Sequence, residues 1–513
     1  MARTTLRKSL FGVGIGRICA VAAASTAAEM ADLVRVGLRE TPTIELRLDW
    51  LRSDSERSRF LLWLKRNRPR GTTFLATCRR REGGGRFRGG AQAELYWLNE
   101  AREAGCSWCD LEIETVRELP RKSLNELGLP PHILLSLHDF QRMPSQLKSV
   151  RSAAHPEADA LKIAAQAHTI GDSLRLVRLV RRSPNLVAVP MGEVGLPARI
   201  LALREGSALA YAPVGEATAP GQVSLHALKH LYRAQELTQR TRVYGVIGDP
   251  VGHSLSPLLH NTGFVARKID AVYLPFLVKD LGDFLKAVPE LGIRGFSVTI
   301  PHKQSILRHL KECERLAAEI GAVNTVVVHR DGSLFGWNTD YIGILRALEK
   351  KLAMAGSRVL VFGAGGVARA AAVALAKAGA HVAVCARREK AARELARAVG
   401  GEVVVRRALR RESFDAILNA TPIGMHPHDR ISPLSPQELN CRVVMDLINR
   451  PEKTQLLKLA ARKGIATVSG VEMFIPQGVA QWELWTGQSA PESAMRKAVL
   501  GALRSEEKSR QHS

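Results

Sequence analysis

The fold of the second half of the chain is decided by the stretch Arg358-Val359-Leu360-Val361-Phe362-Gly363-Ala364-Gly365-Gly366-Val367-Ala368. The apolar run that ends at Phe362 predicts a buried strand, and the alanine-rich segment up to Lys377 predicts a helix. A second strand is expected over His381–Ala386. A strand, a glycine-rich turn and a helix in this order are the context of a dinucleotide fingerprint, in which helix N-terminal amides hold a pyrophosphate. The sequence therefore predicts a Rossmann domain whose phosphate-binding turn consists of Gly363, Ala364, Gly365, Gly366 and Val367.

The end of the second strand indicates which dinucleotide binds. NAD enzymes usually place Asp or Glu there, to bind the ribose hydroxyls. This chain has Ala386-Arg387-Arg388, and a guanidinium suits a 2′-phosphate. We therefore expect Arg387 and Arg388 to favour NADP(H) over NAD, although two arginines at a strand end can also be a solvated surface feature.

Upstream, from Arg17 to Arg233, short apolar runs alternate with amphipathic segments. Eight strands separated by helices over this length match the repeat of a (β/α)8 TIM barrel. The expected strands are Ile18–Ala23, Thr43–Leu48, Thr73–Cys78, Cys109–Ile113, Ile133–Leu137, Ala160–Ile163, Leu186–Val189 and Leu209–Ala212. The polar stretch Leu231–Arg242 predicts a connection, and the second region opens with a strand over Val243–Ile247. The fold class is therefore α/β in both regions.

Composition limits the function. The chain has 513 residues, 46% of them apolar and 24% charged, which is ordinary for a globular protein and allows about two to four domains. Its 74 lysine and arginine residues against 49 acidic ones give a net charge of +25, which suits nucleic acid, an anionic membrane surface, anionic substrates or a generally basic proteome. Aromatic residues make up only 5%, and the sequence has no basic-aromatic motif or zinc module, so nucleic-acid binding is not expected. No apolar window is long enough to span a bilayer, so no membrane insertion is expected.

The seven cysteines are odd in number and scattered, which favours a reducing compartment, here the cytoplasm, over a disulfide framework. Cys106 and Cys109 form a C-x-x-C, but no second pair of ligands lies nearby to complete a zinc site. Cys109 also enters a predicted strand, whereas a redox motif begins a helix. We therefore expect two thiols packed at a strand entrance, and no metal site.

The ends of the chain allow more than one interpretation. Arg3, Arg7 and Lys8 precede the small apolar stretch Ile18–Ala24, a pattern found in weak signal or transit peptides. The favoured interpretation is a first core strand, followed by a helix that begins within Thr26–Met30. At the other end, Ser505–Ser513 contains no apolar residue, which predicts disorder. The sequence does not decide between a monomer and a dimer.

Ionisable residues recur at the carboxyl ends of the predicted barrel strands, where barrel active sites lie. They are Glu45, Arg47, Asp49, Arg79, Glu82, Asp110, Glu112, His138, Asp139, Lys162 and Arg199. A lone lysine in an apolar strand, such as Lys162, is costly to bury in its charged form, which favours the free amine that attacks carbonyl groups. His138 is the natural proton carrier beside it, because histidine titrates near neutral pH. Three arginines at the same mouth suit a carboxylate substrate, although each of these residues by itself can equally be structural.

At these positions the chain resembles the type I 3-dehydroquinate dehydratases. The matching segments follow the family's order and are Glu45-Leu46-Arg47-Leu48-Asp49, Cys78-Arg79-Arg80-Arg81-Glu82-Gly83-Gly84, Ser136-Leu137-His138-Asp139-Phe140, Lys162-Ile163-Ala164, Met191-Gly192 with Arg199, and Ala219-Pro220-Gly221-Gln222.

This resemblance implies that Lys162 forms an imine with the substrate ketone, that His138 removes the neighbouring proton and later protonates the departing hydroxyl, and that Glu82 orients His138. The residues that it assigns to the substrate carboxylate and ring hydroxyls are Glu45, Arg47, Arg79, Arg199, Thr218 and Gln222. Two positions depart from the pattern, because Ala198 and Thr218 stand where the family usually has serine.

The second region carries further motifs. Gly252-His253-Ser254-Leu255-Ser256-Pro257 supplies paired hydroxyls, Ser297-Val298-Thr299-Ile300-Pro301-His302-Lys303 places a lysine at a helix start, and Gly336-Trp337-Asn338-Thr339-Asp340 supplies a carboxylate. Each also has a plain structural interpretation as a helix cap, a surface lysine or a turn aspartate. Together with Gly321-Ala322-Val323-Asn324-Thr325, Asn419-Ala420-Thr421-Pro422-Ile423-Gly424-Met425 and Gly470 to Gln477, these motifs resemble the shikimate dehydrogenases over the whole region.

This second resemblance implies that Lys303 and Asp340 form a proton-transfer pair while NADPH delivers hydride to the ring ketone. The implied substrate-binding residues are Ser254, Ser256, Thr299, Asn324, Asp340 and Gln477, and the further implied cofactor contacts are Thr421, Leu447 and Gly470. In Asp446-Leu447-Ile448-Asn449-Arg450-Pro451, asparagine stands where the family usually has tyrosine, so we expect the contact made by that phenol, and the kinetics of this half, to differ.

Together the resemblances imply a bifunctional enzyme, because the dehydratase product, 3-dehydroshikimate, is the substrate of the dehydrogenase. We expect a dehydratase barrel over residues 1–235 and a dehydrogenase over 242–505. The expected parts of the dehydrogenase are a substrate-binding lobe (242–345), a Rossmann NADP-binding lobe (346–480) and a C-terminal helix (481–505). The expected partners are small molecules: 3-dehydroquinate, 3-dehydroshikimate and shikimate. The alternatives are a catabolic quinate/shikimate dehydrogenase that uses NAD and a non-catalytic metabolite sensor, the latter disfavoured by the intact Lys162, His138, Lys303 and Asp340.

Overall fold

The structure, a computed structural model, describes residues 17–119, 124–147, 150, 155–183, 185–215, 221–426 and 428–511. The chain divides into two compact units. One consists of the residues up to Thr241 together with Leu274–Gly292, and the other of Arg242–Tyr273 together with the residues from Ile293 onward. Within the described ranges, no helix has the length and apolar character needed to cross a membrane.

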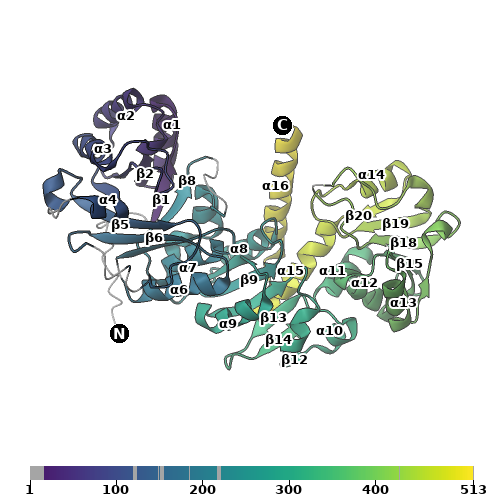
Figure 1. Cartoon of the computed structure of the whole chain (residues 1–513). Helices are drawn as coiled ribbons and strands as arrows, with labels where there is room; N and C mark the ends of the chain where they lie inside the picture. Colours follow the sequence, from purple (N-terminus) through teal and green to yellow (C-terminus); the bar gives the residue numbers. More distant parts are fainter. Residues whose placement is uncertain are drawn as a thin grey trace. The chain divides into compact units, whose positions relative to one another are not determined.

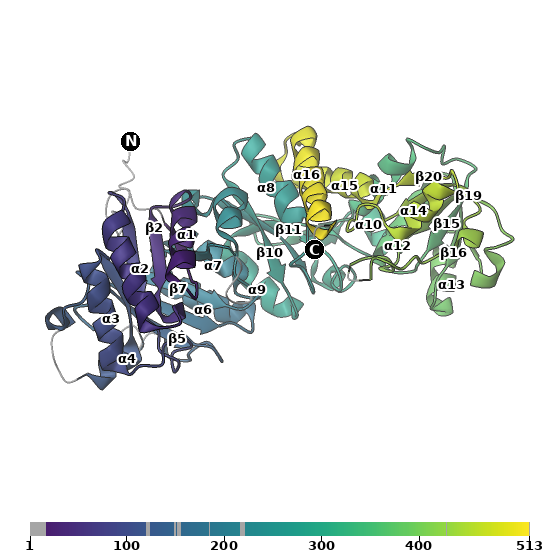
Figure 2. The same cartoon turned by 90° about the horizontal axis from the view of Figure 1, so that it is seen from above.

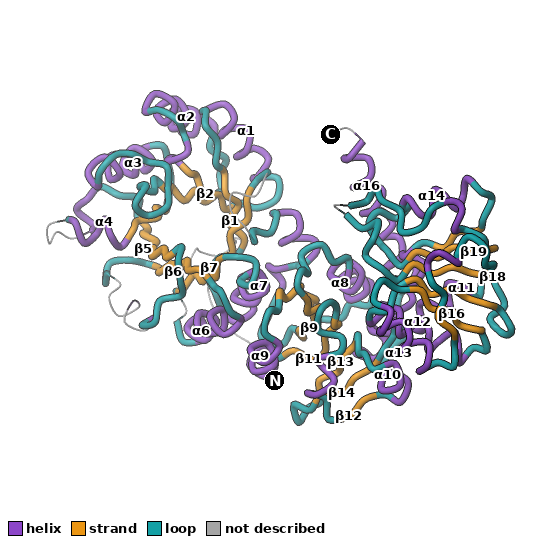
Figure 3. The backbone as a smooth tube through the Cα atoms, turned by 45° about the vertical axis from the view of Figure 1, so that its right-hand side comes forward, coloured by secondary structure: helices purple, strands orange, loops and turns teal. Residues whose placement is uncertain are grey.

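The first unit is built around a parallel sheet of eight strands, hydrogen-bonded in the order β7-β6-β5-β4-β3-β2-β1-β8. The strands are β1 (Ile18–Ala22), β2 (Thr43–Arg47), β3 (Thr73–Thr77), β4 (Trp108–Glu112), β5 (His132–Asp139), β6 (Ala160–Gln166), β7 (Leu186–Met191) and β8 (Ala210–Pro213). Because β1 pairs with both β2 and β8, the sheet curves into a nearly closed ring with helices outside it (Figure 3). The predicted TIM barrel is confirmed, and each predicted strand end lies within three residues of the observed one.

The outer helices of the barrel are α1 (Ala27–Leu38), α2 (Asp54–Asn67), α3 (Ala91–Glu103), α4 (Ile113–Glu118), α6 (Ile170–Arg181) and α7 (Leu196–Glu205) (Figure 1). Local sequence fixes where they begin. Thr26 and Glu29 form a reciprocal capping box at the start of α1, and Thr169 and Asp172 form another at the start of α6. The core strand and helix expected after the N-terminal segment are therefore confirmed.

The two-residue period of a strand decides which side chains enter the barrel. In β6, Leu161, Ile163 and Ala165 belong to the core cluster that includes the outer helix α6. Lys162 lies on the opposite face of the same strand, with its Nζ 5.0 Å from the centroid of the Tyr211 ring in β8. The lysine therefore points into the barrel interior.

The region after the barrel begins with a mixed sheet in the order β10-β9-β11-β13-β14-β12. Its strands are β9 (Arg242–Gly248), β10 (Ala271–Leu277), β11 (Ile293–Val298), β12 (Glu312–Cys313), β13 (Thr325–Val328) and β14 (Leu334–Trp337). The helices of this region are α8 (Ser256–Ala266), α9 (Leu281–Leu291) and α10 (Arg315–Ile320), and α8 packs against the C-terminal helix α16 (Glu492–Gln511) (Figure 2). Since β9 and β11 are parallel, the loops that follow them leave the same edge of the sheet.

A second sheet of this unit is parallel throughout, in the order β17-β16-β15-β18-β19-β20. Its strands are β15 (Arg358–Phe362), β16 (His381–Cys385), β17 (Glu402–Val403), β18 (Phe414–Asn419), β19 (Cys441–Asp446) and β20 (Ala466–Val468), with helices α11 (Asp340–Leu348), α12 (Gly366–Lys377), α13 (Glu389–Ala398) and α14 (Gln455–Arg462). Val359 and Val361 of β15 pack in the cluster that contains α12, whereas Leu360 and Phe362 pack in the cluster that contains α14. Both faces of the sheet are buried, as in other parallel sheets, and the predicted Rossmann domain is confirmed.

The C-terminal part differs from the prediction. Two helices, α15 (Gly470–Thr486) and α16, take the place of the single helix expected over 481–505, because Gly487 ends α15 in the left-handed conformation with φ of 67°. The disorder expected over Ser505–Ser513 is wrong as far as Gln511, the last residue of α16. Glu506 forms an ion pair with Arg450 at 2.7 Å. The polar segment therefore continues a helix that contacts with other parts of the chain already hold in place.

Candidate active sites

The lysine expected to form an imine is buried in the barrel. Lys162 is 4% exposed and forms an ion pair with Asp110 of β4. Lys162 is the one charged residue of its own strand, but the strand order brings a carboxylate from two strands away into the same interior. The Asp110 carboxylate therefore balances the charge of the buried Lys162 side chain.

Asp110 is the centre of this cluster. Its carboxylate also accepts hydrogen bonds from Ser136 Oγ at 2.5 Å and from Arg79 Nη2 at 3.2 Å. Burial by itself raises the pKa of Asp110, but Lys162 and Arg79 hold that pKa well below its usual range. The barrel interior thus contains a fixed negative charge between two cations.

His138 lies on the same face of β5 as Ser136, two residues further along the strand. Burial lowers the pKa of His138 well below its ordinary value, and Arg79 and Lys162 lower it further. The imidazole is therefore neutral, as a base requires. Its Nδ1 lies 3.8 Å from Oε1 of Glu112, at the end of β4.

Glu82, which the resemblance assigns to orienting His138, lies in the turn after β3. The Glu82 side chain is exposed, and among the described residues it makes no hydrogen bond or ion pair. The following residue, Gly83, is packed so closely on Glu112 that a Cβ there would lie 1.9 Å from Oε1. Glu112 fills space next to the imidazole, with its Oε1 3.8 Å from His138 Nδ1.

The residues expected to bind the substrate at β2 already have partners. Glu45, 4% exposed, accepts a hydrogen bond from Thr77 Oγ1 at 2.7 Å. Arg47 binds Asp49 through two hydrogen bonds, Nε to Oδ1 at 2.9 Å and Nη2 to Oδ2 at 2.8 Å. These contacts fix both side chains at the barrel mouth.

Arg199, on α7, donates to the carbonyl oxygens of Pro190 at 2.6 Å and Gly221 at 3.1 Å. Burial lowers its pKa to about 10, so the guanidinium is still charged at neutral pH. Gln222 is half-buried directly after Gly221. Thr218 lies outside the described residues.

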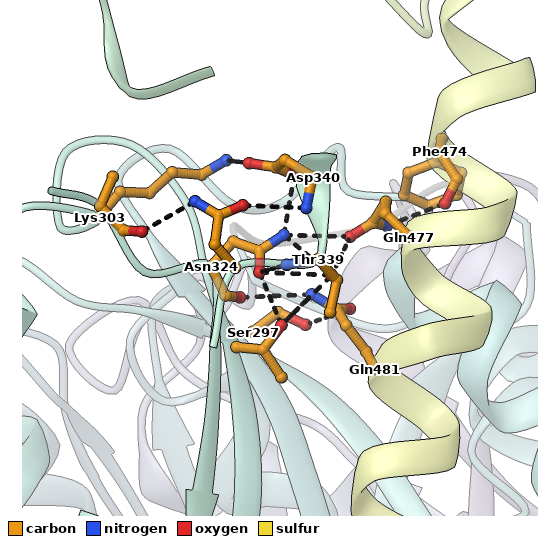
Figure 4. A network of polar contacts seen from close by, with 11 residues as sticks. Ser297, Lys303, Asn324, Thr339, Asp340, Phe474, Gln477 and Gln481 are labelled. Carbon is orange, nitrogen blue, oxygen red and sulfur yellow. Dashed lines mark hydrogen bonds and ion pairs between the residues drawn. The ribbon is translucent and has the colours of Figure 1, made fainter. Parts of the chain in front are cut away.

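In the dehydrogenase region, Lys303 Nζ and Asp340 Oδ2 are 2.6 Å apart (Figure 4). The second carboxylate oxygen, Oδ1, accepts a hydrogen bond from Asn324 Nδ2 at 2.8 Å. Lys303 comes from the loop after β11, Asp340 is the first residue of α11, and Asn324 directly precedes β13. The structure therefore brings three residues of separate predicted motifs to one point.

A network of amides and hydroxyls extends from this pair to α15 (Figure 4). Gln477 Oε1 accepts from Asn324 Nδ2 at 3.4 Å. One helical turn later, Gln481 Nε2 donates to Thr325 Oγ1 at 3.0 Å, and its Oε1 accepts from Ser297 Oγ at 2.8 Å. α15 thus holds the loops on which Lys303 and Asp340 lie.

The other predicted substrate ligands lie at the edge where β9 and β11 end. Ser254 Oγ accepts from the backbone amide of Ser256 at 3.2 Å, at the start of α8. Ser256 is buried beside the Tyr273 hydroxyl, to which it is hydrogen-bonded. Thr299 follows β11, and its amide donates to Ile247 O at 3.0 Å. Two loops that bear hydroxyls therefore leave the sheet side by side.

The turn after β15 fits a dinucleotide. Gly363 has φ of 129°, and a Cβ there would lie 2.9 Å from Ala420 O, so only glycine suits this position. Nothing lies within 4 Å of a Cβ built on Gly365, where α12 begins. The first turn of α12 carries no acidic residue and no side chain caps it, so the amides at its start suit a phosphate. Ala364, between the two glycines, is half-buried.

Arg387 and Arg388 are exposed directly after β16, the strand next to β15. They follow the carboxyl end of a strand, where an open α/β sheet binds its ligand. The strand next to the phosphate-binding turn is followed by two guanidiniums where NAD enzymes usually have a carboxylate, and this suits a 2′-phosphate.

Hydrogen bonds at the ends of β18 and β19 connect Thr421 and Leu447 through Asn419. Thr421 donates from its amide and its Oγ1 to Asn419 Oδ1, at 3.0 and 2.7 Å. Asn419 Nδ2 donates to Asp446 Oδ1 at 3.0 Å, and the Leu447 amide donates to Asn419 O at 3.1 Å. Burial raises the pKa of Asp446 to about 6.

Gly470, at the start of α15, packs on the loop that contains Asn449. A Cβ on Gly470 would lie 2.3 Å from Ile448 O and 2.8 Å from Asn449 Oδ1. Asn449, which replaces the usual tyrosine of the family that the region resembles, therefore lies against the start of α15.

Comparison with known proteins shows which family the chain belongs to. A relative from Arabidopsis thaliana, named bifunctional 3-dehydroquinate dehydratase/shikimate dehydrogenase, chloroplastic, is 34% identical over 473 residues, 87% of this chain and 78% of the relative. This chain belongs to that bifunctional family.

The parts of this bifunctional chain also match separate family descriptions. Type I 3-dehydroquinase matches residues 18–239, and the shikimate dehydrogenase substrate binding domain matches 246–326. NAD(P)-binding matches 351–463, and the shikimate 5′-dehydrogenase C-terminal domain matches 470–500.

Its second half is similar to shikimate dehydrogenase (NADP(+)) from Methanothermobacter thermautotrophicus, at 40% identity over 284 residues, which cover 52% of this chain and 99% of the relative. It also aligns with the crystal structure of shikimate 5-dehydrogenase from Thermus thermophilus in complex with NADP(H) and shikimate. That alignment has 35% identity, covers 51% of this chain and 99% of the other, and has a TM-score of 0.48.

Sequence reasoning missed some residues that these two sites contain. Asp110 and Glu112 were noted only as charged strand ends, although their spacing of two places both on one face of β4. Ser297 stands two residues before Thr299, and Gln481 stands one turn after Gln477 on α15. The same spacing rules could therefore have found them, but not their partners.

Proposed function

We propose that the chain catalyses two consecutive steps of the shikimate pathway. The first is dehydration of 3-dehydroquinate to 3-dehydroshikimate, and the second is NADPH-dependent reduction of 3-dehydroshikimate to shikimate. The observation that carries the proposal is the pair of buried lysine–carboxylate sites, Lys162 with Asp110 in the barrel and Lys303 with Asp340 in the dehydrogenase. The Arabidopsis relative, which matches both halves, is named for both activities.

In the barrel, the Lys162 amine gives up its proton and attacks the ketone carbon of 3-dehydroquinate, and loss of water leaves an imine. The imine withdraws electrons from the neighbouring C–H bond, and neutral His138 removes that proton. The resulting imidazolium returns a proton to the departing hydroxyl, which leaves as water. Hydrolysis of the imine then releases 3-dehydroshikimate and restores Lys162. The residues proposed to bind the carboxylate and ring hydroxyls are Glu45, Arg47, Arg79, Arg199, Thr218 and Gln222.

In the dehydrogenase, Lys303 donates a proton to the ring carbonyl oxygen as alkoxide develops. Asp340 keeps the ammonium in place, and Asn324 fixes the other oxygen of that carboxylate. NADPH, when bound, supplies the hydride. The residues proposed to hold the substrate are Ser254, Ser256, Thr299, Asn324, Asp340 and Gln477.

The proposed cofactor contacts follow from the open turn at α12. The amides of this turn would hold the pyrophosphate, and Arg387 and Arg388 would bind the 2′-phosphate, which would distinguish NADPH from NADH. The full set of proposed cofactor residues is Gly363, Ala364, Gly365, Gly366, Val367, Arg387, Arg388, Thr421, Leu447 and Gly470.

The proposed domain division is a dehydratase over 1–235 and a dehydrogenase over 242–505, with lobes at 242–345 and 346–480 and a C-terminal segment at 481–505. The family matches over 18–239, 246–326, 351–463 and 470–500 support it. A cytoplasmic location is supported by the free thiols of all seven cysteines, which suit a reducing compartment.

A coupled assay on the purified chain tests the function. Given 3-dehydroquinate and NADPH, the protein should form shikimate with consumption of NADPH, and NADH should be a much poorer reductant. Preferred use of NAD in the oxidation of quinate would favour the catabolic alternative. Absence of turnover, with the substrates still bound, would favour a metabolite sensor.

A further inference from the structure

The Tyr273 hydroxyl is a buried polar group that joins two segments of the dehydrogenase site. Tyr273 lies in β10 and is 0% exposed. Its Oη donates a hydrogen bond to Ser297 Oγ at 2.6 Å and is also hydrogen-bonded to Ser256. One phenol therefore contacts a hydroxyl at the start of α8 and a hydroxyl of β11, two segments that lie beside proposed substrate ligands.

The helix α8 determines where this phenol lies. Ser256 and His260 are four residues apart, so they lie on the same face of α8. The Tyr273 ring stacks on the His260 ring, with centroids 4.4 Å apart and an angle of 25° between the planes. Burial lowers the pKa of His260 to about 3, so the imidazole is neutral and serves as a flat packing surface. The tyrosine ring therefore packs on one residue of this face while its hydroxyl reaches the other.

The backbone of Tyr273 is held by the same helix. Asn261 Nδ2 donates to Tyr273 O at 2.9 Å, and Asn261 Oδ1 accepts from the Tyr273 amide at 2.9 Å. The Trp485 ring of α15 has its centroid 5.8 Å from that of Tyr273 and 5.0 Å from that of His260. Because both the backbone and the ring of Tyr273 have fixed neighbours, its hydroxyl has a fixed position.

Hydrogen bonds continue from the phenol toward α15 and β13. Ser297 Oγ, which accepts from Tyr273, donates to Gln481 Oε1 at 2.8 Å (Figure 4). Gln481 Nε2 donates to Thr325 Oγ1 at 3.0 Å, at the start of β13. The phenol is therefore connected to the strand that follows Asn324.

The same network ends at the proposed proton-transfer pair. Thr325 Oγ1 donates to Asn324 Oδ1 at 2.7 Å, and Asn324 Nδ2 donates to Asp340 Oδ1 at 2.8 Å. The other oxygen of Asp340 faces Lys303. One connected set of hydrogen bonds therefore extends from the start of α8 to the Lys303–Asp340 pair.

We propose that Tyr273 is a positioning residue of the dehydrogenase, which holds the Ser256 hydroxyl in the orientation that binds the substrate. A serine side chain rotates about its Cα–Cβ bond unless a partner fixes it, and a partner that fixes it beforehand lowers the entropy cost of binding. The proposal rests on the proposed shikimate dehydrogenase activity. It goes beyond that activity by naming the residue that prepares one of its substrate ligands.

The phenol should change substrate binding and not the chemical step. Burial raises the pKa of Tyr273 well above its usual value, so the hydroxyl keeps its proton at neutral pH and does not act as an acid or base. An interaction that is equally strong in the ground state and in the transition state affects KM and leaves kcat unchanged. Loss of the Tyr273 hydroxyl should therefore appear in the KM for shikimate.

The experiment compares Tyr273→Phe, Ser256→Ala and the double variant in the full chain. Tyr244→Phe is the matched control, because Tyr244 is also buried and its hydroxyl donates to the Trp485 carbonyl, at 3.4 Å, and not to a serine. For each variant, kcat, the KM for shikimate and the KM for NADP+ are measured. The melting temperature reports on the fold, and borohydride trapping on Lys162 reports on the barrel.

Tyr273→Phe keeps the ring that stacks on His260 and removes only the hydroxyl. We expect the KM for shikimate to rise roughly 10-fold, the scale of one hydrogen bond, with kcat and the KM for NADP+ within about twofold of wild type. In the Ser256→Ala background the same substitution should change this KM by less than about twofold, because the group through which the phenol acts is gone. Tyr244→Phe should leave all three constants at their wild-type values.

A second measurement does not depend on steady-state rates. Because shikimate stabilises the chain in proportion to its affinity, it should raise the melting temperature of Tyr273→Phe less than that of the wild type at the same concentration. A destabilised variant still allows this comparison. An equal rise in the two proteins would contradict the proposal.

The same rise of KM from Tyr273→Phe in both backgrounds would overturn the proposal, because the phenol would then act on the fold and not on Ser256. So would a fall of kcat with KM unchanged, or kinetic constants equal to those of Tyr244→Phe. Failure of the proposed function is a separate outcome, because the wild-type chain itself would then neither oxidise nor bind shikimate.

Discussion

Each half of the chain buries a lysine against a carboxylate, but the surroundings of the two pairs differ in kind. In the barrel, Lys162 and Arg79 both face Asp110, and the lysine and aspartate side chains are 5% and 0% exposed. In the dehydrogenase, Lys303 faces Asp340 alone, and the other carboxylate oxygen accepts from the neutral amide of Asn324.

The difference shows which kind of interaction keeps each lysine–carboxylate pair in place. In the barrel, buried charges balance one another, so removal of one leaves the others uncompensated. In the dehydrogenase, amides and hydroxyls from α15 and two loops form a network of hydrogen bonds. Removal of one member therefore leaves its neighbours with other hydrogen-bond partners. The predictions below test this contrast, from the largest expected effect to the smallest.

The largest effect should separate the two sites. Lys162→Ala removes the amine that forms the imine, so dehydration should fall below detection and borohydride should no longer trap an adduct. Shikimate oxidation should proceed at the wild-type rate, because it depends on the other unit. Mass spectrometry of the reduced mixture and both rates check this. An adduct that persists in the variant would contradict it.

The reciprocal substitution should have the next largest effect. Lys303→Ala removes the proton donor of the reduction, so shikimate oxidation should fall by roughly 10²–10⁴-fold. Trapping on Lys162 should be unchanged. If trapping were lost as well, the two sites would not be independent, and the comparison itself would fail.

The two sites should also differ in how far one substitution lowers the free energy of unfolding. Asp110→Asn leaves Lys162 and Arg79 buried without an anion, which should lower the free energy of unfolding of the barrel by about 3–5 kcal/mol. Asn324→Ala removes the hydrogen bonds of a neutral amide, one of them to the Asp340 carboxylate, and should cost about 1–3 kcal/mol in the other unit. Hydrogen exchange of peptides from β4 and α15 measures the two losses. Equal losses of unfolding free energy in the two units would contradict this difference between the charged and the neutral surroundings.

The dehydrogenase should depend on charge at its cofactor edge. Arg387→Ala should raise the KM for NADPH by roughly 10-fold or more, the scale of one hydrogen bond to a charged group, and leave the KM for NADH unchanged. Steady-state kinetics with both cofactors checks this. Equal changes in the two KM values would rule out a contact with the 2′-phosphate.

The smallest effect concerns pH. Burial raises the pKa of Glu94, behind the barrel strands, to about 8, whereas it raises the pKa of Asp446 in the dehydrogenase only to about 6. The folded chain holds protons that the unfolded chain releases, so each group makes stability fall as pH rises toward its folded pKa. Between pH 6 and pH 8 the barrel transition should therefore lose about a few degrees of Tm, and the dehydrogenase transition should lose less.

Glu94→Gln serves as the control for this prediction, because a neutral amide cannot titrate. Calorimetry of the variant should show a barrel transition that changes less between pH 6 and pH 8. A drop as large as in the wild-type chain would assign the effect to other groups.

Much of the fold follows from local patterns. The period of two in Leu161-Lys162-Ile163 places the lysine on the face opposite its apolar neighbours, and the unbroken apolar run of β15 fits a strand that is buried on both sides. The turn at Gly363 can be read directly, because only glycine adopts its φ without strain. The helical end of α16 was missed, because its stability comes from an anchor elsewhere in the chain and not from its own apolar residues.

By itself, the sequence predicted the strands, the start of the first helix and the glycine-rich turn, which follow from residue type and spacing within a few positions. The resemblance to known families added Lys162, Lys303 and Asp340 as candidate reactive groups. The tertiary structure decided that Asp110, 52 residues from Lys162, is its counter-ion, that Gln477, 153 residues from Asn324, supports the second site, and that the Glu112 carboxylate lies 3.8 Å from the His138 imidazole. The physical reason is that a side chain's partner depends on strand register and ring closure, which place residues far apart in sequence on one interior face.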